Sequence, residues 1–185
     1  MSERRAALRA QIEAARQDLL AAIHALTDED WDRPTVNPAW TARDLLTHLA
    51  NAEPGLLTRM RRILGGNSEL PPDFDLDTYN RRLVEKRRGS TVEALISSLA
   101  ESREEVLRFL EGLSDEQLDV QGWNSRRQIT TVAGIFETLA RHERDHARDI
   151  LTARGQGSGV GDCEGSIDTI ERSRSVKSDG FPLFW

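Results

Sequence analysis

The sequence predicts an all-α protein, a four-helix bundle in which a long crossover joins the second helix to the third. Two features of its 185 residues favour helices: 30% are charged and only 5% aromatic, and apolar residues recur at spacings of three and four. The third observation is a weak internal repeat, in which each half is a long helix, a short acidic turn and another long helix. Two helical hairpins joined by a crossover make a four-helix bundle.

The first two predicted helices have clear start signals. The first runs over about residues 3–25 behind Ser2 as its N-cap. The second begins at Thr41, with Asp44 three residues later as a capping-box partner, and ends at the glycines 65–66. The apolar positions of the first helix lie on one face: Leu8, Ile12, Ala15, Leu19, Ile23 and Leu26.

Residues 65–90 form a connector that is long for a link between helices, and we expect a short helix over about 78–87. A third long helix is predicted over about 90–113 and a fourth over about 131–154. Such a connector permits the second and third helices to run in the same direction.

Residues 1–154 are therefore assigned to the bundle and residues 155–185 to a flexible, Gly/Ser-rich extension. The extension ends in the apolar segment Phe181–Trp185, which we expect to be buried against the bundle or a second subunit. A disordered tail is the alternative.

Composition excludes several classes of protein. The net charge of −6 disfavours non-specific binding of nucleic acid or of an anionic membrane, and no apolar run is long enough to span a bilayer. The single cysteine, Cys163, cannot form an internal disulfide. A cytoplasmic protein is expected.

Three of the four histidines fall on the apolar stripes of the predicted helices. His142 and His146 are four residues apart, which places both side chains on one face of the fourth helix, and His48 lies on the stripe of the second. The helical rise puts them at matching depths if the second and fourth helices are antiparallel. His24, near the end of the first helix, is not expected to be a ligand.

A purely structural role is the alternative. Buried histidines need hydrogen-bond partners, and Asp44, Asn51, Glu143 or Asp145 are candidates for that role. If the histidines instead bind a metal ion, Asp44, Asp145 or Asp149 are candidates to orient their rings.

The segment from Trp40 to Ala50, which contains His48, together with the downstream His142-Glu-Arg-Asp-His146, resembles the DinB/YfiT-like superfamily of metalloenzymes. The resemblance covers roughly residues 1–153 and implies a crossover four-helix bundle, often homodimeric. It also implies a divalent metal, usually zinc or nickel, on His48, His142 and His146. Asp149 departs from the family pattern, in which many members have Gln at that position.

The family includes thiol-S-transferases, so the resemblance implies an enzyme whose metal activates a low-molecular-weight thiol. A non-catalytic metal-binding stress-response bundle and a metal-dependent hydrolase are the alternatives, because three histidines leave an open coordination position that suits either reaction. Residues 56–90 carry eight basic and five acidic side chains, so an anionic small-molecule substrate is a further expectation.

Overall fold

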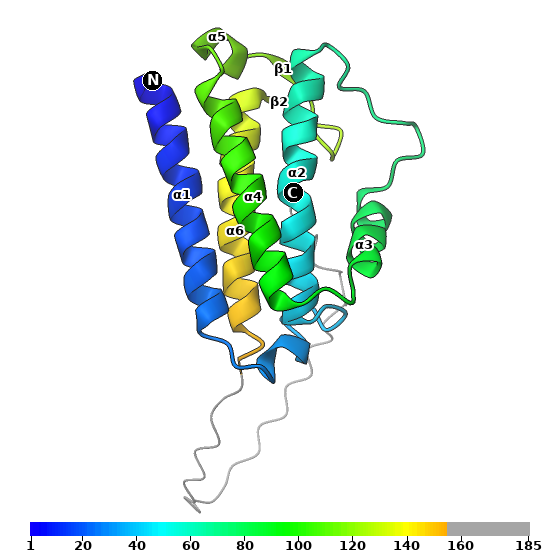
Figure 1. Ribbon diagram of the computed structural model, residues 1–185. Helices are drawn as coiled ribbons and strands as arrows, with labels where there is room; N and C mark the ends of the chain where they lie inside the picture. Colours follow the sequence, from blue (N-terminus) through cyan, green and yellow to red (C-terminus); the bar gives the residue numbers. More distant parts are fainter. Residues whose placement is uncertain (155–185) are drawn as a thin grey trace, which may run out of the picture.

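The computed structural model describes residues 1–154, and four long helices form its body (Figure 1). They are α1 (Glu3–His24), α2 (Ala42–Leu64), α4 (Val92–Glu111) and α6 (Val132–Leu151). The shorter elements are η1 (Asp30–Asp32), α3 (Leu76–Lys86), α5 (Asp115–Leu118), β1 (Gln121–Trp123) and β2 (Ile129–Thr131). The predicted four-helix bundle is confirmed. The assigned extension, Cys163 and the segment Phe181–Trp185 lie outside the described residues.

The antiparallel hairpin of β1 and β2 makes the prediction of an all-α protein wrong in detail. The strands are only three residues long, too short for an alternating pattern to be visible in the sequence. They pair Gln121 with Thr131 and Trp123 with Ile129. Three of these four residues, Thr131, Trp123 and Ile129, are of types that favour extended backbone.

Contacts between helix ends give the direction of each helix. Arg5, near the start of α1, donates to the carbonyl of Glu111 at the end of α4, so these two helices are antiparallel. Arg61, near the end of α2, bonds Glu105 in the second half of α4, so α2 and α4 run the same way (Figure 1). The backbone N–H of Val36, just before α2, donates to Thr152, just after α6, which makes α2 and α6 antiparallel.

Each long helix begins behind a Ser or Thr side chain that accepts a hydrogen bond from a backbone N–H of the first turn. Thr41 accepts a hydrogen bond from the Asp44 N–H, and the Asp44 carboxylate accepts from the Thr41 N–H, the reciprocal pair of a capping box. Ser2, Thr91 and Thr131 cap α1, α4 and α6 by the same side-chain contact. Each such cap stabilises its helix by about 1 kcal/mol.

The core consists of two hydrophobic clusters separated by a polar layer. One cluster contains Ile12, Met60 and Phe136, and the other contains Leu19 and Leu46. The buried polar residues of the layer come from all four long helices: Arg16, His48, Glu53, Ser102, Arg103, His142, Glu143 and His146. Most of the buried polar side chains of the four long helices therefore lie in this layer.

The hairpin is held against the connector that follows α2. A Cβ atom on Gly122 would lie 2.6 Å from the Ile63 side chain and 2.8 Å from Ser68 Oγ, so only glycine fits there. Ser68 Oγ also accepts the backbone N–H of Trp123. Arg127, whose φ is +58°, donates from its side chain to the carbonyl of Pro71. These contacts fix the β1–β2 loop beside α2.

None of the helices within residues 1–154 is both long and apolar enough to cross a membrane.

Candidate metal centre

The structure brings His48, His142 and His146 together in the polar layer. His48 comes from α2, and the other two lie one turn apart on α6. One ring nitrogen from each side chain lies within 4.8 Å of the others, and Nε2 of His48 is 3.1 Å from Nε2 of His142. A tetrahedral centre with bonds of about 2 Å to nitrogen holds its ligand atoms about 3.3 Å apart. The three rings are thus spaced for one ion.

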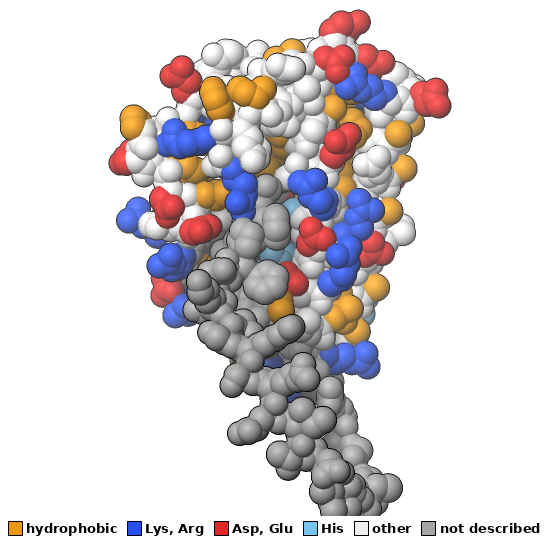
Figure 2. Space-filling model, turned by 180° about the vertical axis from the view of Figure 1, so that it is seen from behind, with side chains coloured by type: hydrophobic (Ala, Val, Ile, Leu, Met, Phe, Trp, Pro, Cys, Tyr) orange, Lys and Arg blue, Asp and Glu red, His pale blue; other side chains and the backbone are white. Residues whose placement is uncertain are grey.

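All three histidines are buried, with exposures of 1% for His48 and 4% for each of the other two. The Trp40 ring meets His48 edge to face at 5.3 Å and closes one side of the group. Figure 2, seen from behind, shows histidine surface near the middle of this face, with Lys or Arg side chains close to it on both sides. The histidine cluster therefore lies close to this face of the molecule.

His146 supplies the observation that tests the fit of a cation. Its Nδ1 lies 3.0 Å from Asp149 Oδ2, which favours the tautomer with the proton on Nδ1. Its Nε2 is buried and has no hydrogen-bond partner within residues 1–154. A buried nitrogen without a partner is costly. A metal ion among the three rings would accept the lone pair that this tautomer leaves on Nε2.

Burial lowers the pKa of His48 and of His142 well below the usual value for histidine. The neighbouring His146 lowers both further, and His48, Arg141 and Arg126 add to the effect at His142. These two imidazoles are therefore neutral at physiological pH. Neutral imidazoles are the form that binds a metal ion.

Arg126 was not foreseen as a site residue. It lies in the loop between β1 and β2, and its charge acts on His142. Its backbone N–H donates to Asn124 Oδ1 within a tight loop. The sequence holds only a turn-forming Asn-Ser pair before two arginines, which does not indicate where the turn will dock.

The other candidates from the sequence have different roles. Asp44 belongs to the cap of α2, Asn51 donates to the Thr47 carbonyl, and Asp145 pairs with Arg148. His24 is exposed at the end of α1. Of the three candidate carboxylates, Asp149 is the one that contacts a histidine in the described structure, whereas Asp44 and Asp145 have the other partners just given.

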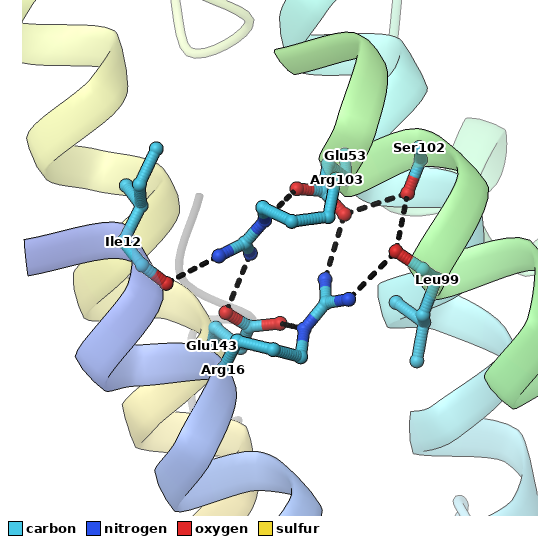
Figure 3. A network of polar contacts seen from close by, with 7 residues as sticks. All are labelled: Ile12, Arg16, Glu53, Leu99, Ser102, Arg103 and Glu143. Carbon is cyan, nitrogen blue, oxygen red and sulfur yellow. Dashed lines mark hydrogen bonds and ion pairs between the residues drawn. The ribbon is translucent and has the colours of Figure 1, made fainter. Parts of the chain in front are cut away.

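Next to the histidines, a ring of ion pairs crosses the bundle (Figure 3). Arg16 contacts Glu53 at 2.7 Å and Glu143 at 2.6 Å, and Arg103 contacts the same two carboxylates at 2.6 and 2.7 Å. Ser102 adds a hydrogen bond to Glu53. The nearby carboxylates raise the pKa of Arg103 despite its burial. Glu143, named from the sequence as a partner for a histidine, instead belongs to this ring.

The comparisons with known proteins follow this geometry. Residues 11–150 match the sequence profile of the DinB superfamily. A protein of Oceanobacillus iheyensis, provisionally named a metal-dependent hydrolase, is 26% identical over 149 residues, which cover 80% of this chain and 84% of that protein. The fold is similar to YfiT from Bacillus subtilis, described as "a probable metal-dependent hydrolase with an unusual four-helix bundle topology". The TM-score is 0.67 at 19% identity, over 83% of this chain and 87% of that one.

Proposed function

Because this chain belongs to the DinB superfamily, we propose that it is a metal-dependent hydrolase whose divalent cation is held by His48, His142 and His146. The observation that carries the proposal is the buried Nε2 of His146, which has no hydrogen-bond partner in the described chain and faces two neutral imidazoles. The names given to the relatives in Oceanobacillus iheyensis and Bacillus subtilis support the choice of hydrolysis.

Three protein ligands suit catalysis better than a structural role. Structural zinc sites usually have four protein ligands, whereas catalytic sites keep one position open for water or substrate. A divalent cation held here would supply Lewis acidity and a water molecule of lowered pKa. Histidine ligands suit zinc and nickel, and we propose one of these.

The remaining residues prepare the site for that chemistry. Asp149 bonds Nδ1 of His146 and would leave Nε2 free to hold the ion, and the Trp40 ring covers one side of His48. The charges of Arg126 and Arg141, which act on His142, favour an anionic group close by. We propose an anionic small molecule as the substrate.

Activation of a thiol, as in the thiol-S-transferases of the family, would need the same three ligands. The geometry of the histidines does not distinguish the two reactions. Hydrolysis is preferred because both relatives carry that description.

Metal analysis and hydrolysis assays on purified full-length protein test the proposal. We expect about one equivalent of zinc or nickel per chain, and hydrolysis of simple esters or amides that chelation abolishes and added metal restores. His146→Ala should lose both metal and activity, whereas His24→Ala, at an exposed histidine, should retain both. Metal retained by His146→Ala would refute the ligand set, and a metal-loaded protein that transfers thiols but hydrolyses nothing would refute hydrolysis.

A further inference from the structure

A cavity of about 740 Å³ lies between α2 and the connector that leads into α3. The connector swings away from α2 and returns through α3 (Figure 1), and the wall is completed by α4 and by Ser125 of the hairpin loop. We call it the arch cavity. Its volume is typical of small-molecule sites. None of the three clustered histidines lines it.

Three arginines line the arch cavity: Arg59, Arg62 and Arg87. Within residues 1–154 their hydrogen bonds go to neutral oxygens, for example from Arg59 to the Ser68 carbonyl at 2.8 Å and from Arg87 to Ser98 Oγ at 2.8 Å. In the chain up to residue 154, no carboxylate forms an ion pair with any of the three. The neighbouring Arg61, which does not line the cavity, is paired with Glu105.

Arg59 is the most telling of these cations because it is buried, with 7% exposure. Burial lowers its pKa, and the charge of Arg62 lowers it further, so two cations on one wall repel each other. A buried charge without a counter-ion is costly. An anion between Arg59 and Arg62 would remove that cost.

The remainder of the wall suits an apolar group. The rings of Phe74 and Tyr79 lie 5.6 Å apart and both face the cavity, together with Leu70 and Leu83. Two carboxylates also belong to the lining: Glu105 is paired with Arg61, which leaves Glu101 as one negative charge against the three arginines. The wall therefore retains unpaired positive charge beside an aromatic surface.

We propose that the arch cavity binds a small organic carboxylate with an aromatic or branched apolar body, its carboxylate between Arg59 and Arg62. The cavity begins beside the histidines: Asn51, part of its wall, follows His48 by one helical turn. The helical rise separates His48 from Arg59 by roughly 16 Å along α2. If the protein is the hydrolase proposed above, the cavity would hold the anionic end of an elongated substrate whose scissile bond reaches the histidines.

The test of the cavity is a titration of metal-stripped, full-length protein with 4-phenylbutyrate, in which NMR spectra measure binding. The neutral amide of the same compound is the matched control. We expect the carboxylate to bind and the amide to bind at least about tenfold more weakly, since a charged hydrogen bond contributes about that factor. Arg62→Gln and Arg59→Gln should each weaken binding of 4-phenylbutyrate about tenfold. Arg61→Gln, next in sequence and outside the cavity, should leave the affinity within about twofold.

The proposal would be overturned by no binding at millimolar concentrations, by equal binding of the amide, by an equal loss of affinity in Arg61→Gln, or by loss of binding in His146→Ala. The last result would place the carboxylate at the histidines instead. An Arg62→Gln variant that binds 4-phenylbutyrate with unchanged affinity but melts at a lower temperature would also overturn the proposal. That result would show that the arginines only hold the connector against α2. If Arg59→Gln does not fold, Arg62→Gln decides alone. Because the protein is metal-free and no turnover is measured, failure of the hydrolase proposal leaves this result unaffected.

Discussion

Asp149 binds one ring nitrogen of His146 and leaves the other without a partner in the described residues: its Oδ2 is 3.0 Å from Nδ1, while Nε2 is buried within the histidine cluster. One carboxylate thereby fixes both the tautomer and the orientation of a ring that contributes one of three candidate ligand atoms. The pair is separated by a single turn of α6.

Asp149→Asn should lower metal affinity about 10- to 100-fold, the usual effect of removing a carboxylate that orients a ligand histidine. The helix should remain intact, because the side chain is partly exposed. Competition with a chromogenic chelator measures the affinity. Asp145→Asn, one turn earlier and paired with Arg148, is the control and should bind metal as the wild type does. Equal affinities for the two variants would contradict the orienting role.

The metal-free protein should lose stability as the pH falls below about 6.5, the pKa of histidine in an unfolded chain. Burial lowers the pKa of His48 and of His142, so between that pH and their folded pKa the unfolded state binds more protons. The free energy of unfolding therefore decreases through this window and is greatest above it. Urea titrations at pH 7.5 and 5.5 with chelator present measure the change. The loss of stability between the two pH values should be smaller in the double variant H48Q/H142Q and unchanged in His24→Gln. An equal loss in the wild type and both variants would refute the attribution to His48 and His142.

Arg103→Met should destabilise the fold by about 3–5 kcal/mol, because it leaves Glu53 and Glu143 buried with half of their ion pairs removed. Arg61→Met, which breaks an exposed pair with Glu105, should cost no more than about 1 kcal/mol. Urea unfolding at neutral pH gives both values. Similar losses in the two variants would mean that the ring contributes no more than a surface ion pair.

Gly122→Ala should destabilise the protein by about 1–3 kcal/mol, the usual cost of overpacking, since the new methyl would collide with Ile63 and Ser68. Gly89→Ala provides the comparison because a Cβ there meets nothing within 4 Å. Thermal unfolding of the two variants checks the difference. A melting temperature for Gly122→Ala equal to that of the wild type would show that the hairpin can move away from α2.

The sequence predicts the long helices to within about three residues because their ends are set locally, by caps such as Thr41 with Asp44. The gathering of the three histidines was also predictable, since helical periodicity puts each on an apolar stripe. The hairpin was not, because strands of three residues carry no periodic signal. The position of Arg126 could not be predicted either. It depends on where the loop between β1 and β2 docks, and that is decided by packing at Gly122 and not by the residues next to Arg126.

The ring of ion pairs gives a physical meaning to the faint internal repeat. Arg16 and Arg103 are 87 residues apart, the spacing that relates the two acidic turns, and Glu53 and Glu143 are 90 apart, the spacing that relates the two histidine-bearing helices. Each helical hairpin thus presents one cation and one anion at mid-height, and the ring closes only when the two hairpins meet at equal height. Hydrophobic surfaces alone would tolerate sliding, whereas a shift of one turn, about 5.4 Å, would separate the two pairs that join the hairpins, Arg16 with Glu143 and Arg103 with Glu53. The four charges therefore fix the relative height of the two similar helical hairpins. The same relative height brings His48 on α2 level with His142 and His146 on α6.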